Sequence, residues 1–261
     1  MEDKLLVIGG RTFHSRFFLG TGKFASLSTM REAIVASGSE LVTVAVRRMN
    51  PGTRATDILD FIPEGVTLMP NTSGARTAEE AVRIARMARA AGCGDFVKIE
   101  VITDMVYLMP DNTATLEATR ILAAEGFVVL PYIQPDPVLC RSLEDAGAAA
   151  VMPLGSPIGT NQGLLTRDLI ALIIDQASVP VVVDAGIGRP SHAAEAMEMG
   201  ADAVLVNTAV ATALNPVAAA RSFALAVEAA RLGLLAGLGP QRHTAEASSP
   251  QASFWIGCCN P

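Results

Sequence analysis

Two charged side chains, Lys98 and Glu100, interrupt the apolar, strand-like part of the segment GDFVKIEV (94–101). Successive side chains of a β-strand point to opposite faces, so Lys98 and Glu100 share one face with Phe96. The other face carries Val97, Ile99 and Val101. A buried charge is costly unless it is paired, so a lysine in this setting has either a structural partner or a chemical task. The search for function therefore begins at Lys98.

Two interpretations of Lys98 are open from the residues alone. In the first, Lys98 is an ammonium paired with Glu100 or with Asp184, which lies in another apolar run. In the second, desolvation keeps the amine neutral, so that it attacks a ketone or aldehyde and forms a Schiff base. Burial can lower a lysine pKa by several units, and a neutral amine near neutral pH requires about 4 kcal/mol against the charged form.

Two further segments, DAGIG and NTAV, have the composition of anion-binding loops and each ends an apolar run late in the chain. Gly186 and Gly188 allow backbone N–H groups to approach an anion closely, and a helix that begins near Pro190 would add free N–H groups. Asn207 and Thr208 lead into the next helical segment in the same way. The alternative is that these glycines only form tight turns.

The elements that position these residues follow from a regular alternation in the hydrophobic pattern. Ala-rich amphipathic segments, many of them ended by glycine, separate short apolar runs typical of buried strands. Eight such units in about 250 residues predict an α/β fold, a (β/α)8 TIM barrel, with a doubly wound sheet as the alternative. The predicted strands are 16–22, 41–48, 66–72, 96–101, 128–133, 150–155, 180–186 and 203–210.

In a (β/α)8 barrel the chemistry takes place at the C-terminal ends of the strands, with a phosphate site commonly after the seventh and eighth. Lys98 and Glu100 belong to the fourth predicted strand, Asp184 to the seventh and Asn207 to the eighth. The segment GSPIGTNQG after the sixth strand is longer than a minimal connection and is expected to fold over the mouth of the site. The fold therefore predicts one site that combines a lysine, two carboxylates and two phosphate-binding loops.

The barrel is expected to form a single catalytic domain over residues 1–236, followed by a flexible C-terminal tail over residues 237–261. The residues before 16 are typical of a small hairpin that closes the bottom of the barrel. After residue 237 the chain becomes polar and rich in proline and serine, which favours a mobile end.

Composition argues against several classes of protein. Half of the 261 residues are apolar and the net charge is −6 with no basic stripe, so no nucleic-acid partner is expected. No apolar run reaches the roughly 18 residues of a membrane span, and the first residues do not read as a signal peptide. The cysteines lack the spacing of a metal site, so we expect no metal, no resident cofactor and reduced thiols in the cytoplasm. The four cysteines are Cys93, Cys140, Cys258 and Cys259.

Five motifs together resemble the thiazole synthase family of bacterial thiamine biosynthesis: TVAVRR, VKIEV, MPLGSPIGTNQGLL, VVVDAGIG and VLVNTAVA. The resemblance runs from about Phe18 to Pro250. It implies a (β/α)8 barrel enzyme, expected as a homotetramer, that works through a lysine Schiff base. The implied substrates are 1-deoxy-D-xylulose 5-phosphate, dehydroglycine and sulfur from a thiocarboxylated, ubiquitin-like sulfur-carrier protein.

Carried over position by position, the resemblance assigns roles to residues that the barrel argument had already selected. The Schiff-base lysine falls on Lys98, and the acid and base fall on Glu100 and Asp184. One arginine of the pair Arg47 and Arg48 is expected to point inward, toward carrier or substrate. The implied contacts to the sugar phosphate are Gly159, Ala185, Gly186, Asn207 and Thr208.

Two other classes of function remain as alternatives. A different Schiff-base phosphosugar aldolase or isomerase on the same barrel would explain the lysine and the phosphate loops, but not GSPIGTNQG. A non-catalytic module that binds a ubiquitin-like partner would not need inward-facing charges. The last eleven residues, QASFWIGCCNP, extend beyond the usual end of the family, and a sulfur-transfer role for Cys258 and Cys259 is disfavoured.

Overall fold

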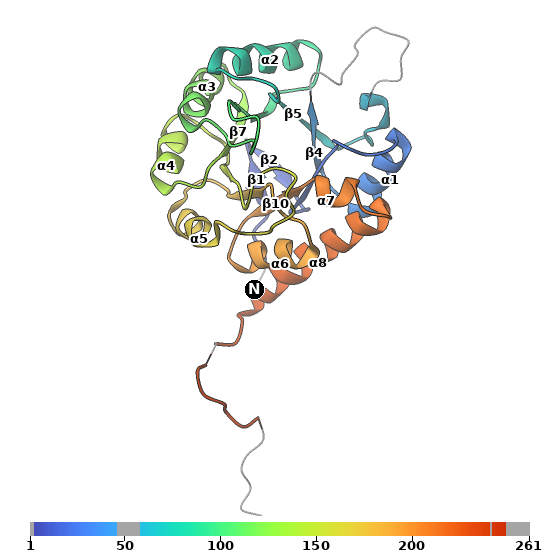
Figure 1. Ribbon diagram of the computed structural model, residues 1–261, viewed down its shortest axis with the longest axis vertical. Coiled ribbons are helices and arrows are strands. Elements are labelled where there is room, and N and C mark those ends of the chain that lie inside the picture. The colour runs from blue at the N-terminus through green and yellow to red at the C-terminus, as the bar shows by residue number, and fades with distance from the viewer. Residues whose placement is uncertain (1–2, 46–57, 241, 249–261) are drawn as a thin grey trace, which may run out of the picture.

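The computed structural model describes residues 3–45, 58–240 and 242–248. Eight strands form one sheet in the order β8-β7-β6-β5-β4-β3-β10-β9. Two parallel bridges, Val151 to Val181 and Leu154 to Asp184, connect the two ends of this sheet. Helices surround the strands as a ring (Figure 1). The predicted (β/α)8 barrel is confirmed, and the doubly wound alternative is wrong because the sheet curls until its two ends meet.

Each strand of the barrel lies within one of the eight predicted runs. Seven of the eight strands are shorter than predicted, because the ends of several runs belong to the loops at the mouth of the barrel, while β7 has the predicted bounds. The last predicted strand is the clearest case, since a short helix, α7 (Thr208–Ala211), occupies its second half. The strands are β3 (Phe17–Gly20), β4 (Leu41–Ala45), β5 (Thr67–Asn71), β6 (Phe96–Ile99), β7 (Val128–Ile133), β8 (Met152–Pro153), β9 (Val182–Asp184) and β10 (Ala203–Val206).

Several of the helices begin at a side chain that accepts a hydrogen bond from one of the first free backbone N–H groups. Ser26 caps α1 in this way, Thr77 caps α2 and Asp136 caps α4. Gly38, at φ +64°, ends α1 in the left-handed conformation that favours glycine. The helices are α1 (Leu27–Ser37), α2 (Ala78–Ala90), α3 (Asn112–Ala124), α4 (Pro137–Asp145), α5 (Arg167–Gln176), α6 (Pro190–Glu198) and α8 (Pro216–Ala236), with a 3-10 turn η2 (Ile58–Phe61).

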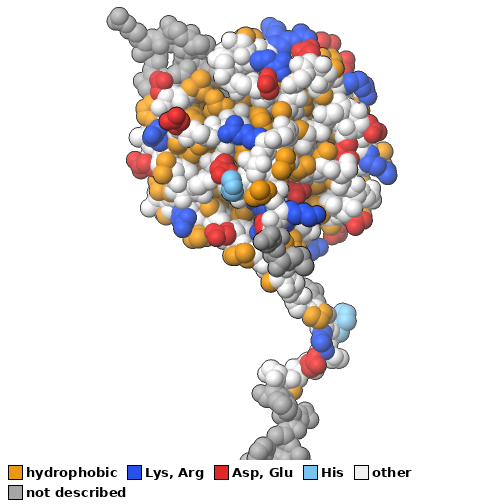
Figure 2. Space-filling model, turned by 180° about the vertical axis from the view of Figure 1, so that it is seen from behind, with side chains coloured by type: hydrophobic (Ala, Val, Ile, Leu, Met, Phe, Trp, Pro, Cys, Tyr) orange, Lys and Arg blue, Asp and Glu red, His pale blue; other side chains and the backbone are white. Residues whose placement is uncertain are grey.

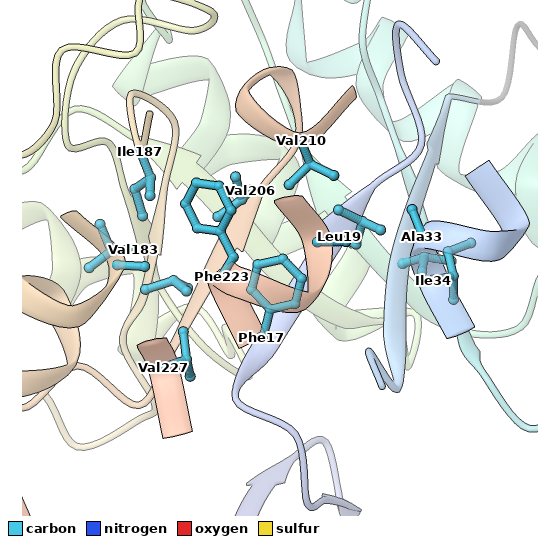
Figure 3. Packing of buried hydrophobic residues seen from close by; sticks show 14 of the residues in the cluster. Phe17, Leu19, Ala33, Ile34, Val183, Ile187, Val206, Val210, Phe223 and Val227 are labelled. Carbon is cyan, nitrogen blue, oxygen red and sulfur yellow. The ribbon is translucent and has the colours of Figure 1, made fainter. Parts of the chain in front are cut away.

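The largest hydrophobic cluster lies between the barrel and the helices α1, α6 and α8 (Figure 3). Phe17 of β3 and Phe223 of α8 stack with their ring centroids 6.2 Å apart. Val206 of β10 and Val183 of β9 belong to the same cluster, so these strands bury their outer faces against helices. This packing fixes the strands whose C-terminal ends carry the candidate phosphate loops.

A second cluster fills the N-terminal half of the barrel interior. The antiparallel hairpin of β1 (Leu6–Ile8) and β2 (Arg11–Phe13) closes this end, as the sequence predicted. The Phe13 ring meets Phe18 edge-on at 5.7 Å and Phe96 at 6.1 Å. The cluster also contains Leu41, Met69, Leu130, Met152 and Val182 from five other strands. The lower half of the barrel is therefore solid and apolar.

Charges of both signs lie on the surface of the barrel, and the chain after the last helix leaves it. Basic and acidic side chains are interspersed on the face shown in Figure 2. No helix in the described ranges is both long and apolar enough to cross a bilayer. Helix α8 ends at Ala236, and the described residues that follow run away from the barrel (Figure 1).

Candidate active site

Strand β6 and the two residues that follow it divide their side chains between the barrel interior and the surrounding helices. Val97, Ile99 and Val101 pack outward in the cluster with α2 and α3. Lys98 and Glu100 point the other way and line an interior cavity. The alternation expected from the sequence is confirmed, and it places two charges above the apolar layer that fills the lower barrel.

Lys98 lies between two carboxylates. Its Nζ is 3.0 Å from Oε1 of Glu100 and contacts Oδ2 of Asp184, which arrives from β9. The three side chains are buried, none of the residues being more than 7% exposed. The second oxygen of Asp184 accepts a 2.7 Å hydrogen bond from the backbone N–H of Ala185, which fixes the carboxylate at the end of its strand.

The protonation of Lys98 follows from this arrangement. Burial by itself would lower the pKa of Lys98, but the charges of Asp184 and Glu100 and their hydrogen bonds outweigh it and raise that pKa above its ordinary value. The interpretation that desolvation alone keeps the amine neutral is therefore wrong for this arrangement. Lys98 is a paired ammonium here, which was the other interpretation of the sequence, because each carboxylate stabilises the charged form.

Tyr132 of β7 completes the surroundings of the lysine, and sequence reasoning missed it. The centroid of its ring is 5.1 Å from Nζ of Lys98. The side chain is fully buried, and its hydroxyl has no hydrogen-bond partner among the described residues. Burial first, and then the charges of Asp184 and Glu100, raise the pKa of this phenol, so Tyr132 stays neutral. Lys98 is paired with Leu130 across the β6–β7 ladder, and the strand period then puts Tyr132 one step nearer the mouth.

The charged centre lies in a cavity of about 510 Å³ at the C-terminal ends of the strands. This is the end at which barrel enzymes carry out their chemistry. All eight site residues expected from the sequence line this one cavity: Lys98, Glu100, Asp184, Gly159, Ala185, Gly186, Asn207 and Thr208. Arg47 and Arg48, for which an inward arginine was expected, lie outside the described residues.

The loop after β8 folds against the loop after β9, and both border the cavity. The N–H of Gly155 donates to the carbonyl of Asp184 at 3.0 Å, and the N–H of Gly163 donates to that of Gly186 at 2.8 Å. Gly186 has φ +78°, and a Cβ there would lie 1.8 Å from Oγ of Ser156. Close packing against Ser156 thus requires glycine at this position, apart from any role of Gly186 in anion binding. Ile158, Gly159 and Asn161 bring the predicted covering loop to the cavity wall.

Lys23 is the second site residue that sequence reasoning did not select. It lies in the turn after β3, lines the cavity and has φ +67°, a left-handed conformation that costs a side-chain-bearing residue of the order of 1 kcal/mol. Its Nζ is 3.2 Å from Oγ1 of Thr208. The signal in the sequence was GTGK (20–23), which ends the first predicted strand and places Lys23 directly after it, at the same edge as the other loops.

Fold and site together define a (β/α)8-barrel enzyme whose centre is a buried lysine held between two carboxylates. The chain belongs to the family of the thiazole biosynthesis protein ThiG, whose sequence model matches residues 7–250. The match covers the barrel and every residue of the site described above.

Relatives and solved structures agree with this assignment. The thiazole synthase of Moorella thermoacetica is 61% identical over 256 residues, 98% of this chain and 100% of its own. That of Syntrophobacter fumaroxidans is 62% identical over 253 residues, 97% and 99% of the two chains. The BexX/CysO complex of Amycolatopsis orientalis contains a chain that is 35% identical with a TM-score of 0.82, covering 93% of this chain and 100% of that one. A thiamine phosphate pyrophosphorylase from Pyrococcus furiosus, 16% identical with a TM-score of 0.57 over 82% and 95% of the chains, shows the fold alone.

Proposed function

We propose that this chain is a thiazole synthase that forms a carboxylated thiazole phosphate through a Schiff base at Lys98. The substrates are 1-deoxy-D-xylulose 5-phosphate, dehydroglycine and sulfur delivered as a carrier-protein thiocarboxylate. The observation that carries the proposal is the position of Lys98, buried between Glu100 and Asp184 in the cavity that every proposed phosphate contact also lines. The names of the most similar relatives support the same activity.

The first step begins from Lys98 as an ammonium, the form that the neighbouring carboxylates favour by raising its pKa. Lys98 transfers a proton to one of its two carboxylate partners, and the neutral amine adds to the substrate ketone. The carboxylic acid then returns the proton to the carbinol oxygen, which leaves as water as the imine forms. The pairing with Glu100 and Asp184 thus supplies the proton acceptor that a charged lysine needs before it can act as a nucleophile.

The second step moves the carbonyl one carbon along the sugar. The protonated imine acidifies the neighbouring C–H bond, and a carboxylate removes that proton to give an enaminol. The carboxylic acid returns a proton to the former imine carbon, so the neighbouring hydroxyl-bearing carbon becomes a ketone and Lys98 stays bound to the sugar as an amine until ring closure displaces it. Glu100 approaches Lys98 from the position that directly follows β6, and Asp184 approaches it from the end of β9. Two carboxylates on different strands can serve two different proton transfers, one as acid and one as base.

The third step requires a partner that reaches the buried centre. The thiocarboxylate of the carrier attacks the new carbonyl, and loss of the acyl group and water leaves the species that captures dehydroglycine and closes the ring. The apolar cluster under Lys98 blocks the N-terminal end, so we place the carrier at the C-terminal face. The similarity to the chain in the BexX/CysO complex supports a partner of this kind.

The sugar phosphate is placed at the loops after β8, β9 and β10, with contacts from Gly159, Ala185, Gly186, Asn207 and Thr208. We further propose a homotetramer in the cytoplasm, with residues 1–236 as the catalytic barrel and 237–261 as a flexible tail. Cys93 and Cys140 are buried and not in disulfides, which fits a reducing compartment. A non-catalytic binding module is disfavoured because it would not need a buried lysine between two carboxylates.

Borohydride trapping tests the proposal directly. With 1-deoxy-D-xylulose 5-phosphate present, borohydride should reduce the imine to one covalent adduct per chain. The chain has only three lysines, Lys4, Lys23 and Lys98, so peptide mapping decides among few positions. We expect the adduct within residues 94–104.

Two variants make the test specific. Lys98→Arg keeps a cation between the carboxylates but cannot form an imine, since a guanidinium does not lose its proton at workable pH. It should abolish both trapping and turnover, whereas a purely structural ammonium would leave activity largely intact. Lys4→Arg, at an exposed position near the N-terminus, should trap like the wild type. An adduct on Lys4 or Lys23, or an active Lys98→Arg protein, would refute the assignment.

A further inference from the structure

Without Lys23, the charged side chains of the described cavity wall would carry a net negative charge. The charged side chains among the described lining residues are Lys23, Lys98, Glu100 and Asp184. Lys98 is committed to the two carboxylates, and this trio carries a net charge of −1. A phosphate monoester is close to a dianion at neutral pH, so the trio would repel it. Lys23 is the cation of the described wall that is left to bind it.

Lys23 reaches the proposed phosphate contacts from outside the loops that form them. Its Nζ donates to Oγ1 of Thr208 at 3.2 Å. The same Nζ lies 3.2 Å from the point where a Cβ on Gly159 would be. The lysine therefore joins two of the five proposed contacts, which come from the loop after β8 and the start of α7. No ion pair between Lys23 and a carboxylate occurs in the described part of the chain.

The backbone holds Lys23 in this place at a conformational cost. Its φ of +67° is unfavourable for lysine. Gly20, three positions before Lys23, faces Asn207 so closely that a Cβ there would lie 2.5 Å from the Cβ of Asn207. A Cβ on Gly22 would lie 2.8 Å from the amide nitrogen of Asn207. The turn is thus packed directly on a proposed phosphate contact. Backbone strain of this kind is characteristic of functional positions and persists only where the surroundings impose it.

We propose that Lys23 is the phosphate-binding cation of the site and sets its preference for a phosphorylated over an unphosphorylated ketose. This inference rests on the proposed function, because it deepens the substrate assignment of the same cavity. The Nζ–Thr208 contact opens to admit a phosphate oxygen, and the neutral donors of Gly159, Gly186 and Asn207 orient the remaining oxygens. Lys23 binds substrate and takes no part in the proton transfers at Lys98.

The test compares affinities in the full-length protein by calorimetry. Lys23→Gln should weaken binding of 1-deoxy-D-xylulose 5-phosphate and of inorganic phosphate by about tenfold or more, since a charge-assisted hydrogen bond is lost. Initial rates of borohydride trapping with unphosphorylated 1-deoxy-D-xylulose should stay within about twofold of the wild type. Lys23→Arg should restore most of the affinity because it keeps the charge.

Two controls separate binding from folding. Lys23→Gly removes the cation but suits φ +67°, so its thermal midpoint should equal or exceed that of the wild type while its phosphate affinity falls. Lys4→Gln removes an exposed cation from the barrel bottom and should leave the affinity unchanged.

The outcomes also separate this inference from the proposed function. Wild-type protein that binds the sugar phosphate but forms no adduct would overturn the Schiff base, and the Lys23 variants would still be judged by their affinities. Lys23→Gln and Lys23→Gly proteins that bind the sugar phosphate as tightly as the wild type would overturn the role of Lys23. Equal losses for the phosphorylated and unphosphorylated sugars would overturn it as well, because they would indicate damage to the whole cavity.

Discussion

Nζ of Lys98 lies 3.0 Å from Oε1 of Glu100, a residue only two positions further along the chain. The strand period of two puts both side chains on the inner face, so a single strand brings a base and its charge partner into the barrel. Asp184 must come from another strand, and it does so at the C-terminal end of β9. The centre therefore depends both on local geometry and on closure of the barrel.

Replacing the carboxylate of Glu100 or of Asp184 by an amide should impair proton transfer while the protein still folds. We expect Asp184→Asn and Glu100→Gln to lower turnover by about a hundredfold or more, the usual contribution of a positioned acid or base. The charge of Asp184 raises the pKa of Lys98 more than the charge of Glu100 does, so the loss of Asp184 should lower that pKa. The pH of half-maximal borohydride trapping should then move downward. Asp168→Asn, with a 97% exposed side chain, is the matched control. Turnover above a tenth of wild type with an unchanged pH profile would contradict this prediction.

The hydroxyl of Tyr132, which has no hydrogen-bond partner among the described residues, leads to an unusual stability prediction. A buried polar group without a partner costs about 1 kcal/mol or more, so Tyr132→Phe should raise the free energy of unfolding by about that amount. The ring beside Lys98 is retained in this variant. Urea unfolding measures the change, and Tyr107→Phe, at a 66% exposed position, should shift it by less than about 0.5 kcal/mol. A clear loss of stability in Tyr132→Phe would mean that the hydroxyl has a partner such as a bound water molecule.

Two glycines with the same φ isolate the contact between the loops after β8 and β9. Gly10 and Gly186 both have φ +78°, but a Cβ on Gly10 would meet nothing within 4 Å. Gly10→Ala should therefore lower the free energy of unfolding by about 1 kcal/mol, the cost of the left-handed conformation alone. Gly186→Ala should cost about 2 kcal/mol more, because its Cβ would overlap Ser156. Equal losses measured in urea would show that the two loops separate easily.

The thiol of Cys140 should be protected in the folded chain. Burial, followed by the charges of Glu144 and Asp136, raises the pKa of Cys140 from 9.0 to about 12. The folded chain then keeps a proton that the unfolded chain releases, so this contribution to stability is complete below pH 9 and is lost as the pH rises toward 12. At pH 9, iodoacetamide should label Cys140 about a hundredfold more slowly in the native chain than in urea. Equal labelling rates of the Cys140 peptide, followed by mass spectrometry, would contradict the prediction.

Sequence reasoning reached the parts of this protein that depend on periodicity. The alternation along residues 96–101 predicted which side chains enter the barrel, and the eight βα units predicted that Asp184 would meet Lys98. It failed where three-dimensional proximity decides. The protonation of Lys98 depends on how closely two carboxylates approach it, and no spacing in the chain encodes that distance.

Two residues were missed for the same reason. Tyr132 looks like an ordinary member of an apolar strand until the neighbouring strand places Lys98 beside its ring. Lys23 looks like a solvated turn residue until barrel closure brings the turn after β3 next to Thr208, 185 positions away. The loop motifs at the mouth of the barrel could be recognised in the sequence, but the contacts between these loops could not be predicted from it.

The apolar layer and the hairpin at the bottom of the barrel have a kinetic consequence. Phe13 and the residues around it leave the described interior with one open end, so reactants that meet at Lys98 arrive by the same route. A carrier tail threaded through that opening would obstruct a sugar phosphate that came later. Under the proposed function, the ketose must therefore bind before the carrier, and the carrier must depart before the product. Because the cavity is closed at its far end, we expect a compulsory-order mechanism.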